Sequence, residues 1–267
     1  MTVAARPEEL LALAVDVAGE AGRLALENQD GIDVLDTKSS PTDVVTEMDR
    51  RCEETIRERL LRERPGDSVL GEESGSDSGT NSVRWIVDPI DGTVNYLYGR
   101  EDWAVSVAAE VAGDVVAGAV VVPRHGDVYT AARGAGAACN GQPLRAARPV
   151  RLDRALVATG FGYSAARRAQ QAEVLRAVLP QVRDIRRGGA AAVDLCSVAR
   201  GRADAYYERG LKYWDWAAAA LVAREAGVRV EGLHHAPPDS ELLLAAPHDL
   251  FEELHDLLAS LGADTTG

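Results

Sequence analysis

Apolar residues in the first 65 positions recur every three or four residues, which is the spacing of an amphipathic helix. The first run predicts a helix over residues 8–28, with Pro7 suited to its first turn. The second run predicts a helix over residues 42–63. Asp49 borders the apolar stripe of this second helix, so we expect its side chain to point inward.

Beyond residue 65 the apolar runs shorten to the lengths of strands and alternate with turn residues. Short loops at 112–114 and 124–126 predict an antiparallel meander, whereas the second half alternates strands with helices. We therefore expect an α+β first part and an α/β second part. The expected strands are 68–71, 84–87, 104–111, 115–122, 127–131, 156–159, 203–208 and 242–246, and the further helices are 165–179, 190–199, 214–226 and 248–261.

The size of the chain suits one compact unit. Its 267 residues are 46% hydrophobic, which allows a large core and excludes disorder. Since no long linker separates the halves, we expect two parts, 1–145 and 146–267, packed together. Cysteines occur without C-x-x-C pairing, which argues against zinc or a disulfide framework. The N-terminus has no signal-peptide pattern and no apolar run reaches 18 residues, so a cytoplasmic protein is expected.

The charge balance narrows the range of partners. The chain has 42 Asp and Glu against 29 Lys and Arg, a net charge of −13. Such a surplus argues against a nucleic-acid partner and against docking to an anionic membrane. An anionic substrate would need a local source of positive charge.

The most informative segment is WIVDPIDGTVN, residues 85–95. An apolar strand leads to Asp88, and Asp91 follows three residues later. Two carboxylates so close repel each other unless a cation lies between them, and hard oxygen ligands suit Mg²⁺ rather than zinc. The N–H groups of Gly92 and Thr93 would begin a helix and form an anion cradle. A cation site beside an anion cradle indicates phosphate-ester chemistry.

Each acidic residue also has a simpler explanation. Asp88 and Asp91 are common turn and cap residues in a D-P-x-D-G sequence. Two further segments weaken that alternative: VLGEES, residues 69–74, ends another apolar strand in carboxylates, and YWDWAA, residues 213–218, places Asp215 at the start of an apolar helix. Taken alone, Asp215 would be a helix N-terminal residue favoured by the dipole.

Taken together, these segments resemble the inositol monophosphatase family, in a bacterial and notably actinobacterial form. The motifs GEE (71–73), DPIDGTVN (88–95) and WD (214–215) match in order and spacing, and the resemblance extends over nearly the whole chain, including KSSPTD (38–43). It implies a layered α-β-α-β-α sandwich, shared with the fructose-1,6-bisphosphatase type, with the active site between the two parts. It also implies a homodimer.

The resemblance implies a ligand set for two or three Mg²⁺ ions. Glu72, Asp88 and the carbonyl of Ile90 would hold one ion. Asp88, Asp91 and Asp215 would hold a second, and Glu72 could share in a third. Lithium inhibition is expected, because a small cation would compete at one of these positions.

The resemblance also implies catalytic and substrate-binding residues. Thr93, within reach of Glu72 and Asp49, would orient and deprotonate a water for in-line attack at phosphorus. Glu208 would meet substrate hydroxyls, although a solvated glutamate at a strand end is an alternative. At Ala190 the family commonly has Ser or Thr, so only the backbone can contribute there. The expected substrate-binding residues are Asp91, Gly92, Thr93, Ala190, Ala191, Glu208 and Asp215, and the five histidines are expected at the surface.

These expectations converge on one leading hypothesis, the Mg²⁺-dependent hydrolysis of inositol 1-phosphate or a related small polyol phosphate. The same chemistry on histidinol phosphate, fructose 1,6-bisphosphate or a nucleotide 3′-phosphate is the nearest alternative. A metal-independent glycosidase with two carboxylates is a different enzyme class. A non-catalytic binding protein is a third possibility, and the retained acidic residues argue against it.

Overall fold

The computed structural model describes residues 6–30, 34–37, 44–146 and 150–265. The 38–43 segment of the family resemblance lies outside the described residues. The described α-helices are α1 (Pro7–Glu27), α2 (Glu47–Glu63), α3 (Thr93–Leu97), α4 (Ala165–Val178), α5 (Ala191–Ala199), α6 (Tyr213–Glu225) and α7 (His248–Ser260).

The strands form a two-stranded, an eight-stranded and a five-stranded sheet. The large sheet has the order β10-β9-β8-β7-β6-β5-β3-β4, and the five-stranded sheet has the order β12-β11-β13-β15-β14. The small sheet pairs β1 (Val34–Thr37) with β2 (Val44–Thr46). The remaining strands are β3 (Ser68–Gly71), β4 (Gly75–Ser76), β5 (Val83–Asp91), β6 (Ala104–Val111), β7 (Asp114–Val122), β8 (Asp127–Ala132), β9 (Gly136–Cys139), β10 (Gln142–Pro143), β11 (Leu156–Thr159), β12 (Asp184–Arg186), β13 (Ala205–Glu208), β14 (Arg229–Glu231) and β15 (Leu243–Ala246).

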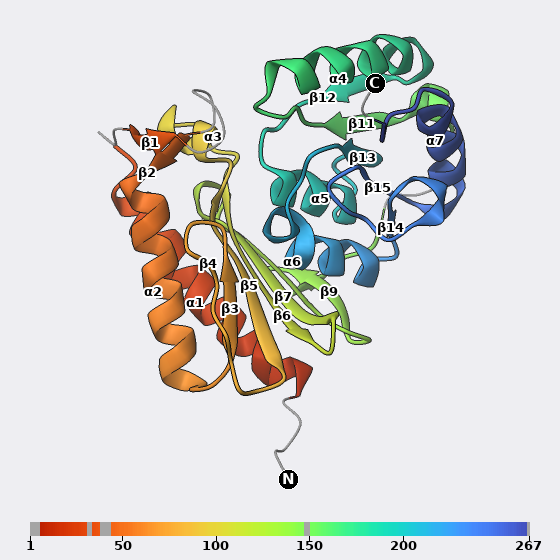
Figure 1. The fold of residues 1–267 in the computed structure, drawn as a ribbon. Coiled ribbons are helices and arrows are strands. Elements are labelled where there is room, and N and C mark those ends of the chain that lie inside the picture. Colours follow the sequence, from red (N-terminus) through yellow and green to blue (C-terminus); the bar gives the residue numbers. More distant parts are fainter. Residues whose placement is uncertain (1–5, 31–33, 38–43, 147–149, 266–267) are drawn as a thin grey trace.

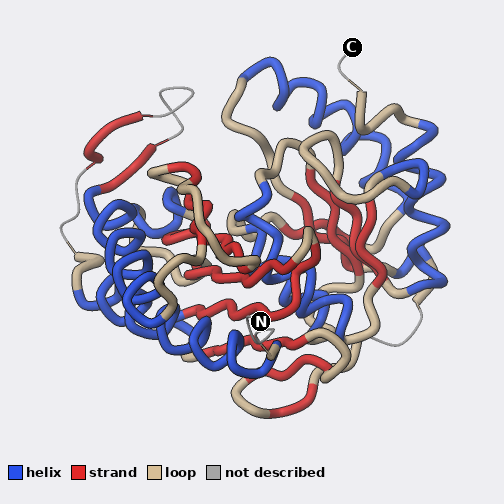
Figure 2. The backbone as a smooth tube through the Cα atoms, turned by 60° about the horizontal axis from the view of Figure 1, so that its bottom comes forward, coloured by secondary structure: helices blue, strands red, loops and turns tan. Residues whose placement is uncertain are grey.

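Five layers follow one another across the molecule (Figure 1). Helices α1 and α2 cover one face of the large sheet, and α5 and α6 pack between that sheet and the five-stranded sheet. Helices α4 and α7 form the outer layer on the other side. Figure 2 likewise shows helices on both outer sides with strands between them. This α-β-α-β-α sandwich confirms the expected fold class.

Three apolar cores hold the layers together. One lies under α1 and α2, a second surrounds α5 and α6, and a third lies between the five-stranded sheet and α7. The middle core includes residues from both sides of position 145, because α6 packs on β5 to β9. The division into parts 1–145 and 146–267 stays a prediction.

The start of α2 differs from the expectation. The helix begins at Glu47 rather than at residue 42, and residues 44–46 form β2, which pairs antiparallel with β1. Two features explain this: the β-branched run of Val44, Val45 and Thr46 favours a strand, and Thr46 caps the helix by accepting a bond from the Asp49 N–H. The helical spacing of apolar residues had extended the helix too far toward the N-terminus.

The motif strand β5 is also longer than expected. It continues from Val83 to Asp91 rather than ending at residue 87. Opposite β6, Asp88 pairs with Ser106 and Asp91 with Ala104, so β5 carries one extra residue there. Pro89 has no N–H to continue the ladder, which is why the irregularity lies at this point.

Other predicted elements lie within a few residues of their expected bounds, and the meander of β6, β7 and β8 is antiparallel. The short strands β1, β4, β9, β10, β12 and β14 were not predicted, because two to four residues carry too little periodicity. All three cysteines are free and buried. None of the helices in the described ranges is both long and apolar enough to cross a membrane.

Candidate active site

The structure gathers carboxylates from three separate elements. Glu72 follows β3, Asp88 lies within β5 with 1% of its surface exposed, and Asp215 is in the first turn of α6. Burial raises the pKa of Asp88 well above its usual range, and the nearby charges of Glu72, Asp91 and Asp215 raise it further. Residues far apart in the sequence therefore form one acidic cluster.

The extra residue in β5 explains how two motif carboxylates meet. In a regular strand, residues three apart point to opposite faces. The bulge between Asp88 and Asp91 breaks that alternation, so both carboxylates contribute to the same cluster. The Ile90 N–H donates to Asp88 Oδ1 at 3.1 Å, which fixes the side chain inside the bulge.

Asp91 joins the two halves of the chain. Its two carboxylate oxygens accept the N–H groups of Ala191 (3.2 Å) and Ala192 (2.7 Å), the first residues of α5. Burial raises the pKa of Asp91 to about 7, although these two hydrogen bonds favour the charged form. The negative carboxylate also suits the positive end of the α5 dipole.

Asp215 is held by its own helix. Its Oδ2 accepts the Lys212 N–H at 2.6 Å, one turn earlier at the start of α6. Burial and the charges of Glu72 and Asp91 raise the pKa of Asp215. The side chain is thus both a cap and a member of the acidic cluster.

Asp49 lies fully buried beneath the β5–α3 turn. Its Oδ1 accepts the Thr93 hydroxyl at 3.1 Å, and its Oδ2 accepts the Thr46 N–H at 2.7 Å. The Thr93 hydroxyl also lies 3.2 Å from the Ile90 carbonyl oxygen. The structure thus brings Asp49 and Thr93 together, while the reach from Thr93 to Glu72 stays a prediction.

A second wall of the site comes from the five-stranded sheet. Glu208 ends β13, and its Oε2 accepts the Tyr206 hydroxyl at 2.6 Å. Burial raises the pKa of Glu208 to about 7, so it is not a freely solvated strand-end residue. A Cβ at Gly160 would lie 1.8 Å from Glu208 Oε2, so the glutamate needs glycine at that position.

Ala190 and Gly92 meet where the two walls approach each other. Ala190 is 2% exposed and caps α5, and a Cβ at Gly92 would come within 3.0 Å of the Ala190 Cβ. Gly92 has a φ of 89°, a left-handed conformation that glycine adopts without strain. The sequence motif therefore needs this glycine for two independent reasons.

The acidic cluster fits a hard divalent cation. Its side chains offer carboxylate oxygens, the ligands that Mg²⁺ prefers. Burying them beside one another raises the pKa values of Asp88, Asp91 and Asp215, and a bound cation would remove that cost. These side chains therefore fit a Mg²⁺ ion, while the ligand set expected from the sequence stays a prediction.

Two neighbours of the site were not predicted. Ala192 supplies the shorter of the two bonds to Asp91. Asp194, one turn into α5, is 7% exposed, and burial together with the charges of Glu208 and Asp91 raises its pKa to about 8. The sequence signal that could have identified Asp194 is that it is the single carboxylate inside the apolar run of residues 190–199.

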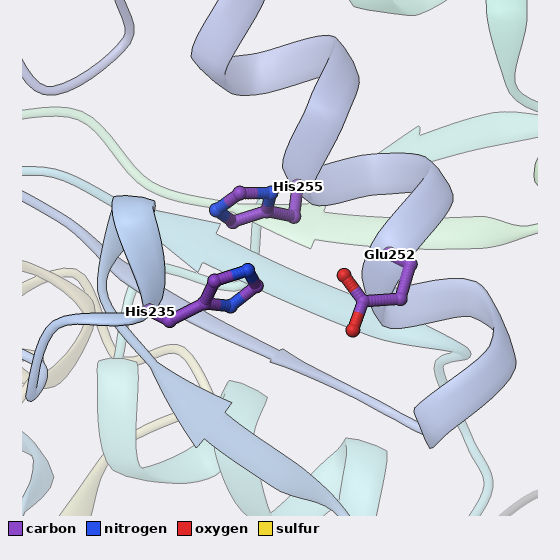
Figure 3. Close-up of side chains that lie close together, drawn as sticks. All are labelled: His235, Glu252 and His255. Atoms are coloured by element: carbon purple, nitrogen blue, oxygen red, sulfur yellow. The ribbon is translucent and has the colours of Figure 1, made fainter.

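A second group of possible metal ligands consists of Glu252 and His255 on α7 and His235 in the loop after β14 (Figure 3). One ligand atom from each of the three lies within 4.8 Å of the others. Arg229 already donates to Glu252 at 2.5 Å, and one of its N–H groups is 2.8 Å from His235 Nδ1. The His255 Nε2 accepts the His234 N–H at 3.0 Å. The group is thus an ion-pair network around an arginine.

This network corrects the expectation that all histidines lie at the surface. His255 is 6% exposed, and its ring stacks on His235 with centroids 4.6 Å apart. It lies on the apolar face of α7, whose spacing places it beside Phe251. The other four histidines are exposed.

Comparisons with known proteins agree with this geometry. A family model described as the inositol monophosphatase family matches residues 6–262. A Mycobacterium tuberculosis (strain H37Rv) protein named inositol-1-monophosphatase SuhB is 50% identical over 210 residues, covering 75% of this chain and 72% of that protein. A Pasteurella multocida protein named Nus factor SuhB is 36% identical over 254 residues, covering 93% and 95%. The solved structure of Mycobacterium tuberculosis SuhB has a TM-score of 0.84 at 42% identity and covers 97% of this chain and 99% of that one.

Proposed function

The chain belongs to the inositol monophosphatase family and is a phosphoric monoester hydrolase, and from that premise we propose that its reaction is the Mg²⁺-dependent hydrolysis of a small polyol phosphate. The proposed substrate is inositol 1-phosphate, which yields inositol and phosphate. The observation that carries the proposal is the cluster of the buried Asp88 and Asp91 with the half-buried Asp215. The raised pKa values of these carboxyls show that a cation there would be favourable. The name inositol-1-monophosphatase of the mycobacterial relative supports the substrate.

Two or three Mg²⁺ ions are proposed to bind at the cluster. Glu72, Asp88 and the Ile90 carbonyl would hold one, and Asp88, Asp91 and Asp215 a second, with Glu72 shared by a third. Bound there, Mg²⁺ lowers the pKa of a water and neutralises the phosphate, so that attack at phosphorus becomes possible near neutral pH.

The chain's own residues would orient the reactants. Thr93, whose hydroxyl donates to Asp49 at 3.1 Å, is proposed to receive a proton from the attacking water and to pass its own toward Asp49, with Glu72 as the second partner. The N–H groups of Gly92 and Thr93 are proposed to hold the phosphate. Since α3 begins at Thr93, these groups have no acceptor within the helix.

Glu208 is proposed to accept hydrogen bonds from the hydroxyls of the polyol. The Tyr206 hydroxyl fixes one of its oxygens, which leaves the other for a ligand. Ala190 and Ala191 contribute backbone atoms only, and Asp91 and Asp215 complete the proposed substrate contacts. With Glu208 to accept hydroxyl groups and two alanines that offer backbone atoms alone, the proposed site favours a small polyol but does not select one isomer.

The test is hydrolysis of inositol 1-phosphate with Mg²⁺, with chelator, and in Asp88→Asn. We expect activity only with Mg²⁺, and a loss of about 10²- to 10³-fold in the variant, because a shared electrostatic group is removed. Asp249→Asn, an exposed change on α7, is the matched control. Turnover of inositol 1-phosphate that persists in chelator would rule out the metal mechanism.

A substrate panel separates the alternatives. Inositol 1-phosphate, histidinol phosphate, fructose 1,6-bisphosphate and a nucleotide 3′-phosphate should be compared under one condition. We expect the highest kcat/KM for inositol 1-phosphate, and Glu208→Gln should lower it mainly through KM. Preference for one of the other three would keep the chemistry and replace the substrate. Lithium at millimolar concentration is expected to inhibit the preferred reaction.

The expected partners follow the same proposal. A homodimer is proposed, and equilibrium sedimentation would test it. The Pasteurella relative carries the name Nus factor, but the net charge of −13 favours no nucleic-acid partner for this chain. A filter-binding assay with labelled RNA at physiological salt should therefore find no retention.

A further inference from the structure

We infer that Glu53 is a positioning residue that fixes the loop carrying Glu72, so that this carboxylate faces the acidic cluster. The inference rests on the proposed function, because it assigns Glu53 a purpose in the proposed metal site. It concerns a side chain of α2 that no motif includes. Glu53 lies one helical turn after Asp49, so one face of α2 would serve the site twice.

The contacts of Glu53 are directed at a single loop. Its side chain is 2% exposed. One oxygen, Oε2, accepts the Glu73 N–H at 2.8 Å, while Oε1 accepts the Ser74 N–H at 3.0 Å and also the Ser74 hydroxyl. Arg57 Nη1 lies 3.7 Å from Oε1 and balances part of the charge. Charge-assisted bonds of this kind are about twice as strong as neutral ones.

The loop is held on its other side by the large sheet. The Glu72 N–H donates to the Val87 carbonyl at 3.3 Å, directly before Asp88. Gly71 precedes it, and a Cβ there would lie 2.4 Å from the Glu53 carboxyl carbon. The Glu53 carboxylate therefore sits against the end of β3, and the backbone from 71 to 74 is fixed between α2 and β5.

Electrostatics explains why such a clamp is needed. Glu72 follows β3 directly beside the part of β5 that carries Asp88, so without a cation the like charges gathered there would push the loop that carries Glu72 away. The three hydrogen bonds that the buried Glu53 carboxylate accepts oppose that repulsion. Pre-organising the ligand before the cation arrives raises the affinity for the cation.

The experiment compares Glu53→Gln with Glu54→Gln, its exposed neighbour on α2. Gln keeps the size of Glu but turns an NH₂ group toward N–H donors. We expect about 10- to 100-fold weaker Mn²⁺ binding by calorimetry in Glu53→Gln, as for other residues that orient metal ligands. Amide exchange at Glu73 and Ser74 should be faster in the metal-free variant, and excess Mg²⁺ should restore much of kcat. Glu54→Gln should behave as the wild type.

Unchanged Mn²⁺ affinity in a folded Glu53→Gln would overturn the inference, even if the melting temperature fell. If wild type and Glu54→Gln also fail to bind Mn²⁺, the proposed function fails instead. Ser74→Ala, which removes only the hydroxyl contact, serves if Glu53→Gln does not fold. It should weaken Mn²⁺ binding about fivefold, and wild-type affinity in that variant would equally overturn the inference.

Discussion

The buried Asp194 and the half-buried Glu208 are carboxyls that the proposed metal set does not use. Burial is the largest cause of their raised pKa values, about 8 for Asp194 and about 7 for Glu208. Asp194 also faces the charges of Glu208, Asp91 and Asp102, and Arg187 offsets part of the repulsion. Each carboxyl therefore takes a proton more readily in the folded protein than in the unfolded chain.

This difference makes the stability of the metal-free protein depend on pH. Below about pH 4 both carboxyls are protonated in either state, so their favourable contribution is complete. As pH rises toward 7 and 8, the unfolded chain has already lost these protons and the folded protein must lose them at a cost. The free energy of unfolding should therefore fall between about pH 4 and 8, by up to about 1.4 kcal/mol per unit of pKa difference.

Asp194→Asn should flatten that dependence, because the amide stays neutral at every pH. Urea unfolding of the metal-free protein at pH 5 and pH 8 measures it. Asp249→Asn, with its exposed carboxyl, should retain the wild-type slope. Equal slopes in Asp194→Asn and wild type would show that Asp194 is ionised without cost.

At the scale of elements, the turn from β5 to α3 determines how the motif presents its residues. Gly92 is the N-cap of α3 in a left-handed conformation, and Thr93 follows it toward Asp49. Asn95 then donates to the carbonyl groups of Asp102 (2.6 Å) and Gly188 (2.9 Å), which ties the short helix to both parts of the chain. The turn therefore transmits any backbone change to Thr93.

Gly92→Ala should destabilise the protein and lower activity. Alanine at a positive φ costs about 1–2 kcal/mol, and its Cβ would also press on Ala190 (3.0 Å) and the Asp102 carbonyl (3.2 Å). Gly99→Ala is a matched control, because Gly99 has a φ of 66° but open space around the added Cβ. Thermal unfolding and kcat should show a larger loss for Gly92→Ala. Equal losses would mean that the backbone conformation, rather than the contacts, decides the effect.

For the whole molecule, the main electrostatic feature is a partly buried acidic cluster between two layers that share α5 and α6. Asp91 binds the start of α5, and Asp215 lies in the first turn of α6. A cation at the cluster would thus bind groups that belong to the large sheet and to both middle helices. It would also supply the positive charge that an anionic substrate needs in a protein of net charge −13.

Mg²⁺ should therefore stabilise the whole protein, and more at pH 8 than at pH 5, where protons compete for the carboxylates. At 100 times its dissociation constant the gain is about 2.7 kcal/mol. Thermal unfolding with and without Mg²⁺ measures it, and Asp88→Asn should lose most of the shift. An unchanged melting temperature in saturating Mg²⁺ would contradict binding to the folded state.

Much of this molecule was predictable from its sequence. The helical and strand periodicities gave most elements, and the spacing of GEE, DPIDGTVN and WD gave the family and the acidic residues that the structure brings together. The predicted start of α2 and the predicted end of β5 were wrong. A helix cap and a one-residue bulge alter the structure without altering the apolar pattern of the sequence. The short strands were not predicted, because they are too short to show a periodic pattern.

The sequence by itself determined the apolar stripes of most helices and strands and the acidic motifs of the family, since both follow from local spacing and residue type. Only the tertiary structure decided what each buried polar group faces. Glu53 clamps the loop beside Glu72, Asp194 faces Glu208, and His255 lies in an arginine network because distant segments meet there. The periodicity of apolar residues indicates which face of an element is buried. The hydrogen bonds, charge and pKa of a side chain on that face depend on neighbours tens of residues away in the sequence.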